Sequence, residues 1–191
     1  GFVRYKINDM WRIEVKDKTG VFDALGESVR KSIFDLGLKT VDSVSVTLVY
    51  TIDGRLNAQD IQMIGKKLLT DPVTQEFSWS KGAVPHYNHS NPHEHIIEIA
   101  YNPGVMDPVE ESTLKGIRDL GIDGAVSVRT AKQYHIKGNL SSGDVQLIVD
   151  KVLANKLIQH LVEEKVQERF IKPRAVKGDV HVVRVDIVDA D

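Results

Sequence analysis

The sequence predicts an α+β protein made of two tandem repeats, each a small antiparallel sheet with two helices, packed together as a pseudo-twofold dimer. The first observation is an internal repeat. Gly20-Val21-Phe22-Asp23 returns 84 positions later as Gly104-Val105-Met106-Asp107, and the phase then holds without a gap. Roughly 22 of about 58 aligned residues are identical between segments 20–77 and 104–161, which indicates a duplicated structural unit.

Two further observations support this fold class. Strands and helices do not alternate singly along each copy, which favours an antiparallel sheet with helices on one face. Each copy of about 75 residues buries only a thin core by itself, because small domains hide a smaller share of their surface. We therefore expect the two copies to pack against each other, with the sheet or the helices of one covering the bare face of the other.

Each copy begins with a strand and a helix. Residues 11–16 and 95–100 alternate apolar and polar side chains, as half-buried strands do. Asp23 and Asp107 are expected to accept hydrogen bonds from the first turn of the helix that follows. In copy two, Pro108 at the first helical position and Glu110 three residues after Asp107 predict a capping box. Both helices are expected to end at a glycine in the left-handed conformation, and these glycines are Gly37 and Gly121.

The second half of each copy contains a β-rich stretch, a second helix and, in copy one, a closing strand. The β-rich stretches span residues 41–52 and 126–136, a length that allows one long bent strand or two. Start signals for the second helices are the pairs Asn57 with Asp60 and Ser141 with Asp144. Residues 73–79 read as the last strand of copy one.

These elements divide the chain into two copies, a linker and an extension. Copy one spans residues 11–79, the linker 80–94, copy two 95–164 and the C-terminal extension 165–191. The linker is punctuated by Pro, Gly, Asn and Ser and lacks apolar periodicity. Within the extension, residues 181–187 alternate like one extra strand, which could pair with a sheet edge or lead into a further domain.

Composition narrows the class of partner. The net charge of −2 gives no general attraction to nucleic acid or to an anionic membrane. No apolar run is long enough to span a bilayer. The chain has no cysteine, which excludes disulfides, thiolate metal sites and cysteine nucleophiles and fits a reducing compartment. We therefore expect a cytoplasmic protein that binds neither nucleic acid nor membrane, and the start at Gly1 fits a piece trimmed from a longer protein.

Histidines crowd the linker, where His86, His89 and His93 precede His95 in the next strand. Imidazole is a common ligand of zinc and copper, so a metal site formed by the first three is one hypothesis. Their spacing matches no rigid helical or turn site, and a polar linker explains them equally. We therefore expect no metal site in this chain, and metal binding by this segment is the weaker alternative.

Few other residues indicate chemistry. A pair of carboxylates at Asp23 and Asp107 could serve acid–base catalysis, but helix capping explains both. The basic strand around Arg129 and Lys132 could bind an anion or an acidic partner, or could be a solvated sheet face. The sequence holds no Gly-rich phosphate loop, zincin motif or nucleophile elbow. We therefore expect no catalytic residue and no cofactor in this chain alone.

The motifs in their order resemble PurS, the small subunit of bacterial and archaeal phosphoribosylformylglycinamidine synthase. The resemblance spans both copies. Copy two carries it in Gly104-Val105-Met106-Asp107-Pro108, Leu120-Gly121 and Val126-Ser127-Val128-Arg129, and copy one in Gly20-Val21-Phe22-Asp23, Gly26 and Lys67-Leu68-Leu69-Thr70-Asp71-Pro72-Val73. Two departures show that the copies have diverged. Glu110 replaces the family-like Gly26, and the Arg-x-Gly-Lys motif survives only as Arg129-Thr130-Ala131-Lys132 in copy two.

The resemblance implies a non-catalytic structural part of a glutamine-dependent ligase of purine biosynthesis. PurS pairs with itself and bridges the synthetase PurL, which binds ATP and magnesium, to the glutaminase PurQ. A tandem PurS region also occurs fused ahead of PurL, so the chain is either a free subunit or such an amino-terminal region. The candidate partner contacts are Arg129, Lys132, Tyr134 and Asp107. A competing hypothesis is a regulatory module with a small-molecule site between the two repeats.

Overall fold

The computed structural model describes residues 10–82 and 91–162. The predicted strand 181–187 and the linker residues His86 and His89 lie outside these ranges. In chain order the elements are β1 (Met10–Asp17), α1 (Ala24–Asp35), β2 (Val41–Gly54), α2 (Ala58–Ile64), the π-helix η2 (Gly65–Leu69), β3 (Gln75–Lys81), β4 (Glu94–Tyr101), α3 (Glu110–Asp119), β5 (Ala125–Gly138), α4 (Ser142–Ile148), the π-helix η3 (Val149–Leu153) and β6 (Gln159–Leu161).

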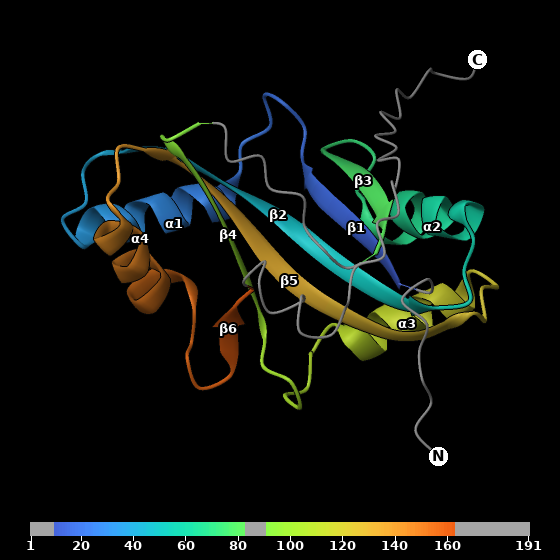
Figure 1. The fold of residues 1–191 in the computed structure, drawn as a ribbon. Helices are drawn as coiled ribbons and strands as arrows, with labels where there is room; N and C mark the ends of the chain where they lie inside the picture. The colour runs from blue at the N-terminus through green and yellow to red at the C-terminus, as the bar shows by residue number, and fades with distance from the viewer. Residues whose placement is uncertain (1–9, 83–90, 163–191) are drawn as a thin grey trace.

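The six strands form one antiparallel sheet in the order β3-β1-β2-β5-β4-β6, with the four α-helices on one of its faces (Figure 1). The predicted fold class is confirmed. The two three-stranded sheets join edge to edge through β2 and β5, so neither covers the other. Each β-rich stretch is a single strand of 14 residues.

A pseudo-twofold axis passes through the pair Leu48–Lys132 in the middle of the sheet. These two residues lie directly opposite each other on β2 and β5, and they are equivalent positions of the two copies. The register continues outward with the same symmetry. One row crosses all six strands through Phe77, Val15, Leu48, Lys132, Ile99 and Leu161. The second half of this row repeats the first in reverse order, so the chain is built like a dimer of its own halves.

The two copies exchange helices over this sheet. Ile33 of α1 belongs to copy one, yet it is fully buried among copy-two residues such as Ile97, Ile136 and Ile148. Ile117 of α3 belongs to copy two and is fully buried with Ile13 and other side chains of copy one. Each hydrophobic core therefore contains both copies. The expected cover by the neighbouring copy comes from its helices, which lie on the shared face.

The second helices begin as predicted. Asn57 and Asp60 form a reciprocal capping box at α2, and Ser141 and Asp144 form the equivalent one at α4. Each box satisfies backbone N–H groups that the first turn leaves without partners. The closing strand of copy one is shifted by two residues, because β3 runs from Gln75 to Lys81 and thus continues into the segment that was expected to be linker.

The first helices begin differently in the two copies. Asp23 caps α1 by accepting a hydrogen bond from the Gly26 amide at 2.7 Å. The capping box predicted at Asp107 is wrong, because α3 starts only at Glu110 and Val109 is its N-cap residue. Gly26 explains the difference, since a Cβ there would lie 2.2 Å from the Val44 carbonyl oxygen. Copy two has Glu110 at this place, so its helix cannot approach the strand as early.

Candidate interaction surface at the pseudo-twofold axis

Three of the four predicted partner contacts lie on the helix-bearing side of the sheet, two of them on β5 and one in the loop before α3. Lys132 stands on the axis and is exposed, whereas its equivalent in copy one is the apolar Leu48. The Lys132 ammonium makes no ion pair within the part of the chain that the structure describes. Tyr134 is buried two residues further along β5. Burial raises the pKa of the Tyr134 phenol, which therefore stays protonated at neutral pH.

Asp107 is the third of these residues, and it connects the start of α3 to β5. One carboxylate oxygen accepts a hydrogen bond from the Val109 amide at 2.9 Å, and the other accepts one from the Thr130 amide at 2.5 Å. Asp23 does the same in copy one, where its second oxygen accepts from the Val46 amide at 2.7 Å. Both aspartates thus fasten the loop before the helix to a central strand. Asp107 is buried, and its bonds to backbone amides account for both of its oxygens.

Arg129, the fourth predicted contact, belongs to the other face of the sheet. Successive side chains along β5 point to opposite faces of the sheet, so Arg129 points away from the face on which Val128 lies in the core. It is exposed and makes no ion pair among the described residues. Arg129 and Lys132 therefore present their positive charges on opposite faces of the same strand, so a flat partner cannot contact both.

The helix-free face contains a buried polar network that the sequence did not reveal. Arg12 of β1 donates two parallel hydrogen bonds to the carboxylate of Glu98 on β4, at 3.0 and 2.6 Å, and a third to Glu14 at 2.6 Å. Arg12 is 2% exposed and Glu98 is 4% exposed. Alternation in residues 11–16 predicted only that Arg12 would face away from the core. Its partner lies three strands away, beyond the reach of any local pattern.

Gln133 and His135 on β5 extend this network. The Gln133 amide donates to Glu98 at 3.2 Å, and its oxygen lies 2.6 Å from Nε2 of His135. Burial lowers the pKa of His135, although the carboxylates of Glu94 and Glu14 act in the opposite direction. Burial alone would also lower the pKa of Arg12, but its hydrogen bonds and charge interaction with Glu98 outweigh this effect and raise that pKa. Arg12 is therefore always charged here.

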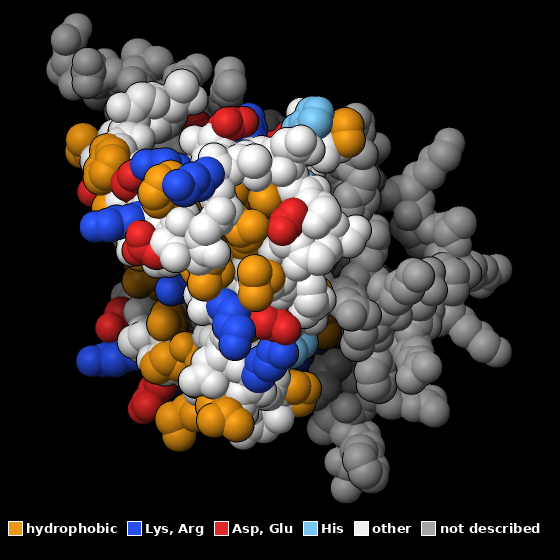
Figure 2. All heavy atoms as spheres, turned by 90° about the vertical axis from the view of Figure 1, so that its left-hand side faces the viewer, with side chains coloured by type: hydrophobic (Ala, Val, Ile, Leu, Met, Phe, Trp, Pro, Cys, Tyr) orange, Lys and Arg blue, Asp and Glu red, His pale blue; other side chains and the backbone are white. Residues whose placement is uncertain are grey.

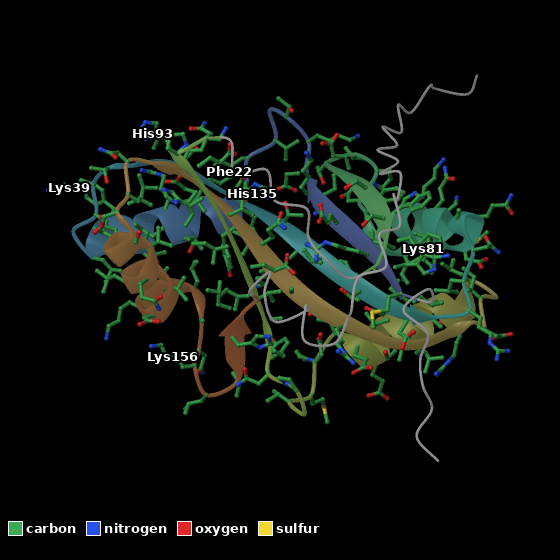
Figure 3. All side chains as sticks on the ribbon, viewed as in Figure 1. Phe22, Lys39, Lys81, His93, His135 and Lys156 are labelled. Atoms are coloured by element: carbon green, nitrogen blue, oxygen red, sulfur yellow. The ribbon has the colours of Figure 1, made fainter. Side chains whose placement is uncertain are left out.

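Among the described residues, the most exposed large apolar side chains repeat with the same 84-residue period. Phe22 and Met106 are equivalent and are 74% and 85% exposed, and Val73 and Leu157 are equivalent and are 78% and 87% exposed. Figure 3 shows Phe22 near the start of α1. Isolated exposed apolar residues need no explanation, but two copies that have kept the same exposed positions indicate contact surfaces. Figure 2 shows apolar, basic and acidic side chains interspersed at the end of the molecule where α1 and α4 lie.

The metal and ligand hypotheses receive no further support from geometry. His93 is exposed at the start of the second described range, and the other two histidines of the hypothesis are outside it, so the metal site stays a prediction. Within residues 10–82 and 91–162, no three His, Asp or Glu side chains are grouped to hold a metal ion. A small apolar pocket next to Lys18, Lys66 and Phe77 lies within copy one rather than between the copies.

No helix of the described ranges has the length and apolar character that crossing a membrane requires.

The fold and its axis define the class of protein: a duplicated α+β module whose two halves form a dimer-like sheet within one chain. The comparisons agree with this architecture. The family model of PurS, described as phosphoribosylformylglycinamidine (FGAM) synthase, matches twice, over residues 10–81 and 94–167. A search of curated proteins found no match. The chain belongs to the PurS family, with one family unit in each copy, and is thereby linked to FGAM synthase and purine biosynthesis.

Proposed function

We propose that this chain is a non-catalytic structural module of FGAM synthase that bridges an ATP-dependent PurL-type synthetase and a PurQ-type glutaminase. The observation that carries the proposal is the double family match, which gives one chain the two PurS units that separate subunits would otherwise supply. The module acts as a free subunit or as the amino-terminal region of a fused synthase. ATP and magnesium are then bound by the synthetase, and the compartment is the cytoplasm.

The architecture suits a part that holds other active sites in place. Ammonia released from glutamine has to reach the synthetase without equilibrating with solvent, where protonation removes its nucleophilicity. A continuous sheet across β2 and β5 fixes the two copies rigidly relative to each other. Covalent linkage also keeps one copy near the other at an effective concentration of the millimolar order for a short flexible connection. Dilution therefore does not separate the two halves.

We assign the direct partner contacts to Lys132 on one face and Arg129 on the other, so that two partners can be engaged at once. Tyr134 and Asp107 are buried and support this surface from below, Asp107 by fastening the α3 loop to β5. The exposed pairs Phe22 with Met106 and Val73 with Leu157 supply apolar contact area. Charges at the rim of such a surface guide encounter and orientation more than they add affinity.

The test is reconstitution of glutamine-dependent FGAM synthesis from PurL-type and PurQ-type proteins with and without this chain. We expect the chain to restore glutamine-dependent activity and to leave ammonia-dependent activity of the synthetase unchanged. Lys132→Glu should lower the apparent affinity for the synthetase or the glutaminase. Lys115→Glu is the matched control, because Lys115 is an exposed lysine of α3 and is not part of the sheet. No effect of the chain on either the binding or the coupling of the two activities would refute the proposal.

A further inference from the structure

The outer edge of β3 is the longer of the two free edges of the sheet. In the order β3-β1-β2-β5-β4-β6, the outermost strands are β3 and β6 (Figure 1). β3 has seven residues, whereas β6 has three. Within the described ranges, no strand pairs with the side of β3 that faces away from β1. In an antiparallel edge strand about every second residue directs its N–H and C=O groups outward, so this edge offers a row of them to a further strand.

The side chains of β3 suit the addition of a strand. Phe77 is buried and Trp79 is half-buried on the helix-bearing face. The strand holds no proline, its pairing with β1 shows no bulge, and its charged residues leave positions 77–80 uncharged. Proline, bulges and inward charges are the usual devices that protect an edge from pairing. A small apolar pocket lined by Phe77 and Lys66 adjoins the strand, so apolar surface is uncovered beside this edge.

We propose that segment 181–187 of the same chain pairs with the outer edge of β3 as a seventh strand. This segment, His-Val-Val-Arg-Val-Asp-Ile, lies outside the described ranges and is as long as β3. Its alternation puts Val183, Val185 and Ile187 on one side. It also lies beyond both stretches that the PurS model matches, which end at residues 81 and 167. The inference therefore goes beyond the bridging role and does not depend on it.

The alternation fixes which side of the added strand faces the helices. The three apolar side chains come to lie next to Phe77 and Trp79, over the apolar surface at the pocket. Arg184 then comes to lie on the helix-free face, near Glu76, which pairs with Lys16 at 3.2 Å. A slip of one residue would put the apolar side chains on that polar face, so burial of apolar surface selects the register to within even steps.

The length of the connection fits the distance to be crossed. β6 lies at the opposite edge of the sheet, and five strand spacings separate it from β3, which is about 24 Å. Residues 163–180 form a connection of 18 residues. A flexible chain of this length has a root-mean-square end-to-end distance of about 21–25 Å. Because this length matches the span, the effective concentration of the segment at β3 is near its maximum, which favours the same chain over a second one.

Hydrogen exchange of the full chain, followed by mass spectrometry, measures the pairing directly. Val185→Pro removes a backbone donor from the added strand, and Val185→Asp places a charge on its apolar side. We expect exchange in the peptide that covers residues 75–81 to become at least about tenfold faster in both variants, because its outward amides lose their acceptors. Val176→Pro and Val176→Asp are the matched controls, since Val176 lies in the connection. They should leave this exchange unchanged.

Equal exchange of residues 75–81 in the Val185 and Val176 variants would overturn the proposal. Faster exchange of residues 159–161 instead would overturn it too, because the segment would then pair with β6. Protection of β3 that disappears on dilution, together with a dimer in analytical ultracentrifugation, would identify a second chain as the occupant and refute pairing within one chain. If far-UV circular dichroism shows that Val185→Pro does not fold, Val185→Asp decides by the same criteria.

Discussion

Truncation of Ile117 tests whether the two copies fold as one unit. This side chain is fully buried on α3, and it contacts the core formed mainly by β1, α2 and β3 of the other copy. Replacement of a buried isoleucine by alanine costs about 2–5 kcal/mol, from lost transfer free energy and the cavity that remains. A value of about 3 kcal/mol with an m-value of about 2 kcal/mol/M shifts the urea midpoint by about 1.5 M.

Two reporters follow unfolding separately. Trp11 and Trp79 are the two tryptophans of the chain and stack edge to face with ring centroids 5.5 Å apart in this core, so fluorescence reports its state. Far-UV circular dichroism reports both copies. Ile33→Ala makes the same truncation in the opposite core, where there is no tryptophan. Because each core contains both copies, we expect Ile33→Ala and Ile117→Ala to lower the fluorescence and dichroism midpoints together.

The result that would contradict this reasoning is specific. If Ile33→Ala left the fluorescence midpoint at the value of the unmodified chain while the dichroism transition became biphasic, the cores would unfold independently. Leu25→Ala is the control, because Leu25 is exposed on the same helix as Ile33. Surface truncations of this kind change the free energy of unfolding by at most about 0.5 kcal/mol.

Three further predictions concern single sites. Asp107→Ala should lower the free energy of unfolding by about 1–3 kcal/mol, measured by urea denaturation, because it leaves the Thr130 amide without its acceptor; an unchanged midpoint would argue against the role of this bond. Gly26→Ala should lower the melting temperature, since its Cβ would lie 2.2 Å from the Val44 carbonyl oxygen, whereas Gly143→Ala meets only an ordinary contact at 3.7 Å and should be neutral or stabilising. Burial lowers the pKa of His135 in the folded chain, so the unfolded chain binds the proton more tightly and the contribution of His135 to stability, present above about pH 6.5, is lost as the pH falls. His135→Gln should therefore weaken the decrease in melting temperature between about pH 7 and 5, and an identical pH profile would exclude this residue as a cause.

The sequence predicted what depends on local pattern. The capping residues Asn57 and Ser141 and the left-handed Gly37 and Gly121 each act within a few residues, and the structure confirms them. Helix capping at Asp23 is confirmed for the same reason. The start of α3 was predicted wrongly, because the close approach that prevents an earlier start involves a strand about 20 residues further along the chain. In copy one the local sign of this approach is Gly26, where a Cβ would clash with the Val44 carbonyl oxygen.

How the copies join depends on contacts that no local pattern contains. Alternation along β2 and β5 shows which residues share a face, but it does not show that the two strands pair with each other. Stacked sheets and an edge-to-edge sheet both bury apolar surface, and the amphipathic pattern alone fits either. Lys132 and Arg129 were predicted as partner contacts because a basic strand appears in only one copy, and this role stays a prediction. The pair Arg12–Glu98 could not be predicted, since its partners are 86 residues apart and each resembles a solvent-facing residue of a strand.

One difference between the copies is a compensating pair of changes, which shows how a duplicated chain can keep its symmetry while its halves diverge. A Cβ at Gly65 would lie 2.3 Å from the Phe77 ring, so the large ring requires the small residue. At the equivalent places copy two has Val149 and Leu161, where a larger residue on the helix accompanies a smaller one on the strand. The ion pair does not follow this pattern, since copy one also has a glutamate, Glu14, at the place of Glu98, and only Arg12 is replaced, by Ile96. The change at Gly65 and Phe77 is tolerated because both partners changed together, and either residue exchanged singly between the copies would lose its matching partner.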